Sequence, residues 1–165
     1  MVFDSLKEMK KEEFCGFVSV GELQEYNCEQ VPKTPDVYFI LHESNAPRFR
    51  KESIGGHFKG KNPTVDQKEL FQNWVEDSKI VYIGKAGRPT GSATLQSRLR
   101  QYMKFGQGKP IGHWGGRYIW QLENSSELIV AWKPTNGVDP REIEKSQISS
   151  HKSTHGKRPF ANLTG

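Results

Sequence analysis

The chain has 165 residues, which is enough for one compact domain with a hydrophobic core but would leave two domains unusually small. Its 24 lysines and arginines outweigh 19 acidic residues, and the resulting charge of +5 permits a polyanionic partner without requiring one. With only Cys15 and Cys28, the chain has no disulfide framework or cysteine-based zinc site, which favours a reducing compartment. Since neither a signal peptide nor a membrane-length apolar run is present, we expect a cytoplasmic protein with no membrane partner.

The amino-terminal part of the chain, residues 1–34, is polar and highly charged, with apolar side chains that recur only loosely. This composition predicts a helical arm followed by a short element. The prolines of VPKTP interrupt regular structure, and the β-rich run VYFIL (37–41) predicts the first strand of a domain over residues 35–165. Residues 42–78 form an unusually long connection to the next strand-like run, KIVYI (79–83), and we expect an insertion that contains one helix.

A helix is predicted over residues 92–105, because Leu95, Leu99 and Met103 form an apolar stripe at i, i+4, i+8 spacing. The glycine-rich loop GQGKPIGHWGGR (106–117) follows this helix. Two further strand-like runs, YIWQL and LIVAW, come next in the chain.

The last helix is predicted from its capping signals and its apolar arc. Asp139 can serve as the N-cap, Pro140 suits the first helical position, and Glu142 stands where a capping box places it. Glu144, by contrast, falls within the inward arc that Ile148 helps to define. A carboxylate among apolar neighbours is costly unless it meets a cation or a metal ion, so Glu144 is a candidate ligand.

Two tyrosines occupy matching places in the first two predicted strands, Tyr38 in VYFI and Tyr82 in VYIG. If the strands pair, their phenolic hydroxyls come close together. Aromatic pairs across neighbouring strands are also common as plain packing, and that alternative stays open. Gly84 and Lys85 follow Tyr82 as an expected turn, where a glycine would let a phosphate or the lysine approach the strand end.

On the helix over 92–105, Arg98 and Tyr102 border the apolar stripe. An arginine held at the edge of a core usually meets an anion, and its planar fork suits both carboxylates and phosphates. The partner of Arg98 is therefore either Glu144, in an ion pair, or a phosphate of a ligand.

The histidines carry weaker signals. His113 in the glycine-rich loop and His57 in GGHFKG could each contact a phosphate, although ordinary loop positions are the more common role. His151 and His155 are four residues apart and could share a helix face, but no HExxH motif or nearby cysteine accompanies them, so a zinc site has little support.

Taken in order, these motifs resemble the GIY-YIG nuclease family, including its homing and restriction endonucleases. The segment VYIGKA is similar to the nuclease domain of the nucleotide-excision-repair incision subunit. The matching residues are Val37, Tyr38, Tyr82, Ile83, Gly84, Lys85, Ala86, Leu95, Arg98, Leu99, Tyr102, Glu144, Ile148, Pro159 and Asn162. The chain departs from the pattern in having Asp36 in place of a glycine, the insertion over 42–78 and a longer final loop.

The resemblance implies an α/β (α+β) fold with a central, mostly antiparallel three-stranded sheet flanked by helices. It implies hydrolysis of phosphodiester bonds with one Mg²⁺ or Mn²⁺ ion held by Glu144. Arg98 would neutralise charge on the phosphate, and Tyr38 or Tyr82 would orient or deprotonate the attacking water. A phenol normally titrates near pH 10, so a cation such as Lys85 or the metal must lower its pKa. Supporting roles are expected for Gly84, Lys85, Tyr102, His113 and Asn162.

The partner implied is nucleic acid, with DNA favoured over RNA. A surface for backbone contacts is predicted from the basic residues Arg48, Arg50, Lys59, Lys61, Lys104 and Lys109. The competing hypothesis is a module that keeps this fold and binds nucleic acid without cleaving it.

Overall fold

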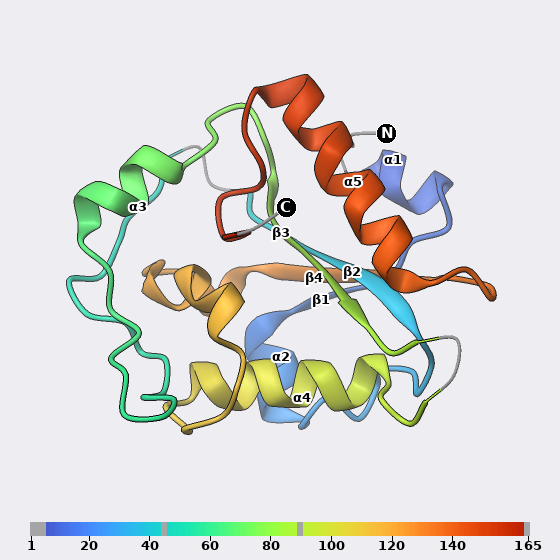
Figure 1. Ribbon diagram of the computed structural model, residues 1–165, viewed down its shortest axis with the longest axis horizontal. Coiled ribbons are helices and arrows are strands. Elements are labelled where there is room, and N and C mark those ends of the chain that lie inside the picture. Colours follow the sequence, from blue (N-terminus) through green and yellow to red (C-terminus); the bar gives the residue numbers. More distant parts are fainter. Residues whose placement is uncertain (1–5, 44–45, 89–90, 164–165) are drawn as a thin grey trace.

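The computed structural model describes residues 6–43, 46–88 and 91–163, and it shows a mixed α/β fold with one sheet between helices (Figure 1). The strands are β1 (Cys15–Ser19), β2 (Asp36–Leu41), β3 (Ile80–Ala86) and β4 (Ile129–Pro134). The α-helices are α1 (Leu6–Lys11), α2 (Val20–Glu25), α3 (Gln67–Asn73), α4 (Leu95–Gly106) and α5 (Pro140–His155). Two 3-10 helices, η1 (Trp114–Gln121) and η2 (Ser125–Glu127), precede β4.

The sheet has four strands in the order β1-β4-β2-β3, and all three pairings are antiparallel. The expectation of three strands was therefore wrong, while the antiparallel arrangement is confirmed. Tyr38 lies opposite Gly84 in the pairing of β2 with β3. Strand β3 continues through Lys85 to Ala86, so the turn expected at Gly84 and Lys85 does not form there. Because β3 lies at the edge of the sheet, residues of α4 and α5 can line a pocket beside it.

The fourth strand, β1, comes from the amino-terminal region for which only a helical arm and a short element were expected. Its backbone is irregular: φ is positive at Gly16 and Phe17, and the register with β4 shifts between Gly16 and Val18. Such a bulge breaks the alternation of side chains that identifies a strand in a sequence.

The run YIWQL was predicted to be a strand, and its first four residues instead form the second half of the 3-10 helix η1. Tyr118, Ile119, Trp120 and Gln121 are all buried in succession. A strand with one solvent-facing side would expose alternate residues. The tight helix is favoured because the ring of Trp120 occupies the space above Gly106 at the end of α4, where a Cβ would lie 2.4 Å from the indole.

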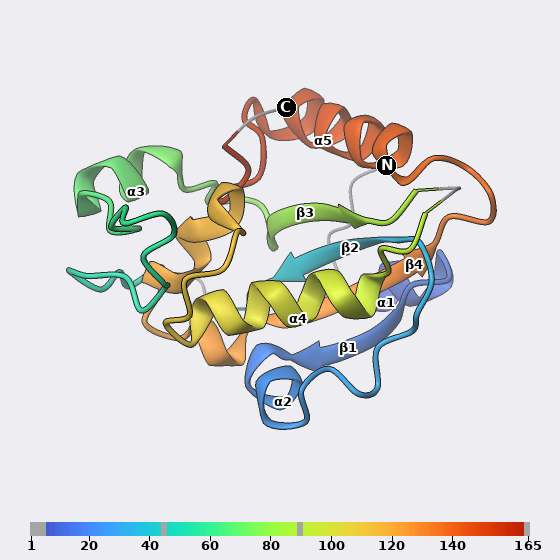
Figure 2. The same cartoon turned by 60° about the horizontal axis from the view of Figure 1, so that its bottom comes forward.

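Helices cover both faces of the sheet (Figures 1 and 2). On one face, Leu95 and Leu99 of α4 and Leu23 of α2 share a core cluster with Tyr38 and Ile40 of β2. On the other face α5 and α1 pack against Val37 and Phe39 of the same strand. The helix expected over 92–105 is confirmed as α4, and Asp139 caps α5 as predicted by accepting a hydrogen bond from the backbone N–H of Arg141.

The insertion over 42–78 contains α3, as expected, and enlarges the core at one end of the sheet. Its aromatic residues Phe49 and Trp74 contact Phe160 of the closing segment, with ring centroids 5.6 and 5.2 Å away. Of the helices in the described ranges, none combines the length and apolar character needed to cross a membrane.

Candidate active site

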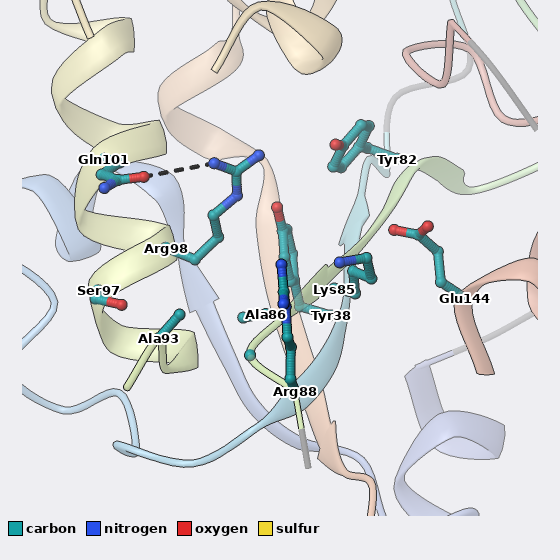
Figure 3. A pocket seen from close by; sticks show the side chains of 11 residues that line it. Tyr38, Tyr82, Lys85, Ala86, Arg88, Ala93, Ser97, Arg98, Gln101 and Glu144 are labelled. Atoms are coloured by element: carbon teal, nitrogen blue, oxygen red, sulfur yellow. Dashed lines mark hydrogen bonds between the residues drawn. The ribbon is translucent and has the colours of Figure 1, made fainter. Parts of the chain in front are cut away.

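A pocket of about 310 Å³ opens beside the edge strand β3, with walls from β2, β3, α4 and α5 (Figure 3). Tyr38 comes from β2, Tyr82 and Lys85 from β3, Arg98 from α4 and Glu144 from α5. In Figure 3, Arg98 and Glu144 extend toward the pocket from opposite sides, with the tyrosines and Lys85 between them. The structure thus brings together the four residues that the sequence singled out, although they lie on four separate elements.

The two tyrosines lie close together because a glycine leaves room for one of them. Their ring centroids are 6.0 Å apart. A Cβ at Gly84 would lie 2.3 Å from Cζ of Tyr38, so the Tyr38 ring rests directly on the backbone of β3. The space above Gly84 is therefore taken by Tyr38, and the phosphate or lysine expected to approach it has no room there.

Burial affects the two phenols differently. Tyr38 is 1% exposed and Tyr82 is 9% exposed. Desolvation raises the pKa of Tyr38 well above its usual value and raises the pKa of Tyr82 to about 12, while the positive charge of Arg98 lowers both. The negative charges of Glu144 and of an ionised Tyr82 further raise the pKa of Tyr38, and the charge of Glu144 also raises that of Tyr82. The cation acting on the tyrosines is thus Arg98 rather than the expected Lys85.

His113 lies beneath the tyrosines rather than at the surface. Its side chain is 2% exposed, it stacks face to face on Tyr102 at 3.6 Å, and its Nε2 is 3.3 Å from the hydroxyl of Tyr38. Burial, and next the charge of Arg98, hold the pKa of His113 well below its usual value, so the ring is neutral. This burial contradicts the phosphate contact expected for His113 and makes it a neighbour of Tyr38 instead.

The Tyr38 hydroxyl and Nε2 of His113 share a hydrogen bond whose donor is set by the tautomer of the ring. The other ring nitrogen, Nδ1, is buried and has no hydrogen-bond partner among the described residues. Tyr102 has a separate partner, because its hydroxyl donates to the carbonyl of Gly116 at 2.6 Å. Tyr102 therefore supports His113 from below and does not face the pocket opening.

Arg98 and Glu144 do not form the ion pair that was the alternative to a ligand-binding role. Within the described ranges, the hydrogen bond of the Arg98 guanidinium is a long contact of 3.4 Å to Gln101. Partial burial raises the pKa of Glu144, and the positive charges of Lys85, Arg141 and Arg98, in that order, oppose the rise. Both side chains thus face the pocket with capacity to bind a ligand.

Asn162 does not line this pocket, and its side chain contacts the backbone of β3 instead. Its side-chain oxygen accepts from the N–H of Ile83, and its side-chain N–H donates to the carbonyl of Ile83, both at 2.9 Å. The neighbouring Ala161 donates its backbone N–H to Val81 at 2.7 Å. Asn162 therefore holds the edge strand in place between Tyr82 and Gly84.

The residues present fit a metal ion that takes few protein ligands. Among residues 6–43, 46–88 and 91–163, no group of three or more His, Cys, Asp or Glu side chains is placed to hold a metal. Mg²⁺ commonly keeps several waters and binds one or two carboxylates together with substrate phosphates, so Glu144 alone suits it. His151 and His155 do not form the zinc pair considered from sequence, because both nitrogens of His151 already contact Lys157 and Ser78.

The cations around the pocket differ from those predicted. None of the basic residues expected to contact a nucleic-acid backbone lines this pocket, and Arg50 instead donates to the carbonyl of Glu123. Lys85, Arg88 and Arg98 line it. Sequence reasoning missed Arg88 and also Arg141, although Arg141 precedes Glu144 by three residues and so shares its helix face.

Comparison with models of known protein families, with curated proteins and with solved structures gives no match for this chain. The fold and the pocket are therefore interpreted from their own residues. They define a mixed α/β protein whose antiparallel sheet carries a polar, cation-rich pocket at one edge.

Proposed function

We propose that the protein is a metal-dependent nuclease that hydrolyses phosphodiester bonds in nucleic acid, with DNA as the favoured substrate. The observation that carries the proposal is the convergence of Tyr38, Tyr82, Arg98 and Glu144 on one pocket from four elements. This set agrees with the resemblance to GIY-YIG nucleases, and it supplies an acceptor for a proton, a cation for the phosphate and a carboxylate for a metal.

Arg98 is proposed to bind the scissile phosphate. Its guanidinium lines the pocket without an ion pair, so its N–H groups can meet the phosphate oxygens in the fork geometry that arginine favours. Lys85 of β3 adds a second positive charge to the pocket. As negative charge grows on the phosphate oxygens in the transition state, these two cations stabilise it.

Tyr82 is proposed as the residue that accepts the proton of the attacking water. It is more exposed than Tyr38. The positive charge of Arg98 lowers the pKa of Tyr82 and so stabilises a phenolate there. Tyr38 and His113, which are hydrogen-bonded to each other, pack behind Tyr82.

Glu144 is the residue that would hold the divalent ion. When bound, Mg²⁺ supplies a positive charge that polarises the phosphate. The raised pKa of Glu144 is opposed by Lys85, Arg141 and Arg98, which favours the ionised carboxylate that a metal needs.

The test is a cleavage assay with Mg²⁺ on supercoiled plasmid, branched DNA and RNA. We expect cleavage by the wild-type protein and a loss of about 100-fold or more in Glu144→Gln. Glu142→Gln is the matched control, because Glu142 is an exposed carboxylate on the same helix. Tyr82→Phe should lose about 100-fold, and Tyr38→Phe should lose less, because Tyr38 acts through Tyr82.

The same assay separates the nuclease from a binding module. Cleavage by Glu144→Gln at the wild-type rate would contradict the proposed role of Glu144. Binding of all three nucleic acids without metal-dependent cleavage of any would instead support the non-catalytic alternative. A rate that rises with pH toward the pKa of about 12 would support Tyr82 as the proton acceptor, because a phenol acts as a base only when ionised.

A further inference from the structure

Tyr82 and Glu144 line two neighbouring pockets and not one. The first is the pocket that contains Lys85 and Arg98. The second also measures about 310 Å³, and Arg141 and Lys145 of α5 contribute to its wall. The candidate catalytic pair therefore forms the border between two pockets that both contain positive charge.

The two cations of the second pocket are arranged for a ligand. Arg141 and Lys145 are four residues apart on α5, so their side chains share a helix face, and Glu144 lies beside them. Both are exposed, and neither side chain forms a hydrogen bond or ion pair within the described ranges. Among the described residues that line the two pockets, Glu144 is the only carboxylate. The second pocket thus attracts anions.

We propose that Arg141 and Lys145 form a second phosphate subsite, which holds the phosphodiester next to the one that is cleaved. The inference rests on the proposed nuclease function. A strand whose scissile phosphate meets Arg98 continues past Tyr82 and Glu144 into the second pocket. A small ester with a single phosphate fills only one of the two pockets. The subsite therefore favours a polynucleotide over a mononucleotide or a small phosphodiester.

Binding can be measured without cleavage. The probe is a fluorescent DNA oligonucleotide, single-stranded or duplex, added without divalent metal to full-length protein in the Glu144→Gln background. Adding Arg141→Gln and Lys145→Gln should weaken binding about tenfold and lower the slope of log affinity against log salt by about 1.5, as expected for two lost phosphate contacts. The matched control is Lys7→Gln with Lys11→Gln, two exposed lysines with the same spacing on α1.

Catalysis gives a second readout with Glu144 intact. Arg141→Gln with Lys145→Gln should reduce kcat/KM for the oligonucleotide at least about fivefold more than for bis(p-nitrophenyl) phosphate, because binding energy from remote phosphates is available only to the longer substrate. Equal urea midpoints of the variant and the wild-type protein exclude a folding defect.

Each outcome decides one proposal. Equal affinities of the Arg141/Lys145 and the Lys7/Lys11 variants would overturn the second subsite. Equal losses on both substrates would also overturn it, because Arg141 would then act on the reaction through Glu144. If the wild-type protein cleaves nothing, the proposed nuclease function fails, and the binding comparison alone still decides whether Arg141 and Lys145 hold phosphate.

Discussion

The space above Gly84 is what places Tyr38 in the pocket. The backbone angles of Gly84 are not in the left-handed region, so the residue is not required for a turn. The requirement is for room, because Cζ and the hydroxyl of Tyr38 would lie 2.3 and 2.5 Å from a Cβ at this position. Tyr38 in turn contacts His113, so a side chain at 84 would disturb the hydrogen bond between Tyr38 and His113.

We expect Gly84→Ala to lower the free energy of unfolding by about 1–3 kcal/mol, because the added methyl group displaces the ring of Tyr38. Urea unfolding measures the change. Gly115→Ala is the control, since a Cβ there meets no atom within 4 Å. When Tyr38→Ala is already present, Gly84→Ala should cost much less. A Gly84→Ala protein as stable as the wild type would show that Tyr38 is not held against the strand.

Residue-level prediction succeeded where helix geometry or a motif fixed the direction of a side chain. Arg98 and Glu144 were selected by their positions around their helices, and both line the pocket. His113 was placed wrongly, because its burial depends on how the glycine-rich loop folds beneath Tyr102, which no periodic pattern records. Arg141 could have been found from the same helix geometry that selected Glu144.

At the scale of elements, the edge strand β3 is held by the closing segment of the chain. Neighbouring strands cover only one edge of β3, so its other edge has backbone groups that need partners. Asn162 supplies both a donor and an acceptor to Ile83, and Ala161 supplies a donor to Val81. A loop residue thus takes the place of a fifth strand beside Tyr82.

Removing this contact should weaken the fold. Asn162→Ala loses two hydrogen bonds and is expected to lower the free energy of unfolding by about 1–3 kcal/mol. Asn162→Asp keeps the shape but turns the donor into an acceptor that faces the carbonyl of Ile83, so it should destabilise at least as much. Urea midpoints and hydrogen exchange of the Ile83 amide measure both effects. An Asn162→Asp protein with wild-type stability would show that Asn162 acts only by packing.

Elements with a strong period or a clear cap were predicted well, and irregular ones were not. Helices α4 and α5 agree with the sequence patterns because each has an apolar face against the core, and β2 agrees because it is a short, fully buried β-rich run. The bulged strand β1 and the 3-10 helix η1 break those periods. Their conformations depend on partners far away in the chain, namely β4 for the strand and Gly106 for the ring of Trp120.

At the scale of the whole molecule, one histidine joins three distant segments. His151 of α5 is fully buried, and its ring nitrogens lie 2.7 Å from the carbonyl of Lys157 and 2.8 Å from the hydroxyl of Ser78. The carbonyl of Ser78 contacts His42 at the start of the insertion. The neutral ring satisfies both partners, because one nitrogen donates to the carbonyl and the other accepts from the hydroxyl.

This arrangement predicts a loss of stability in mild acid. Burial lowers the pKa of His151, and the charge of His155 adds to the effect, while the carbonyl of Lys157 opposes it. An unfolded histidine titrates near pH 6.5, so below that pH the unfolded chain binds more protons than the folded one. The contribution of His151 is therefore fully present above about pH 6.5 and falls below it by at most about 1.4 kcal/mol per pH unit.

The measurement compares wild type with His151→Asn in urea unfolding between about pH 5.5 and 7.5. The asparagine can keep the hydrogen bond to the carbonyl of Lys157 but cannot titrate, so stability should depend less on pH by about 1 kcal/mol over this range. The comparison is needed because Asp36 and Glu144 also make the stability of the fold depend on pH. Their pKa values are raised, so their contribution falls as pH rises, and it does so equally in both proteins. A His151→Asn protein with the wild-type pH dependence would contradict this prediction. The His151 ring would then accept a proton as readily in the folded protein as in the unfolded chain, although it is fully buried between Ser78 and Lys157.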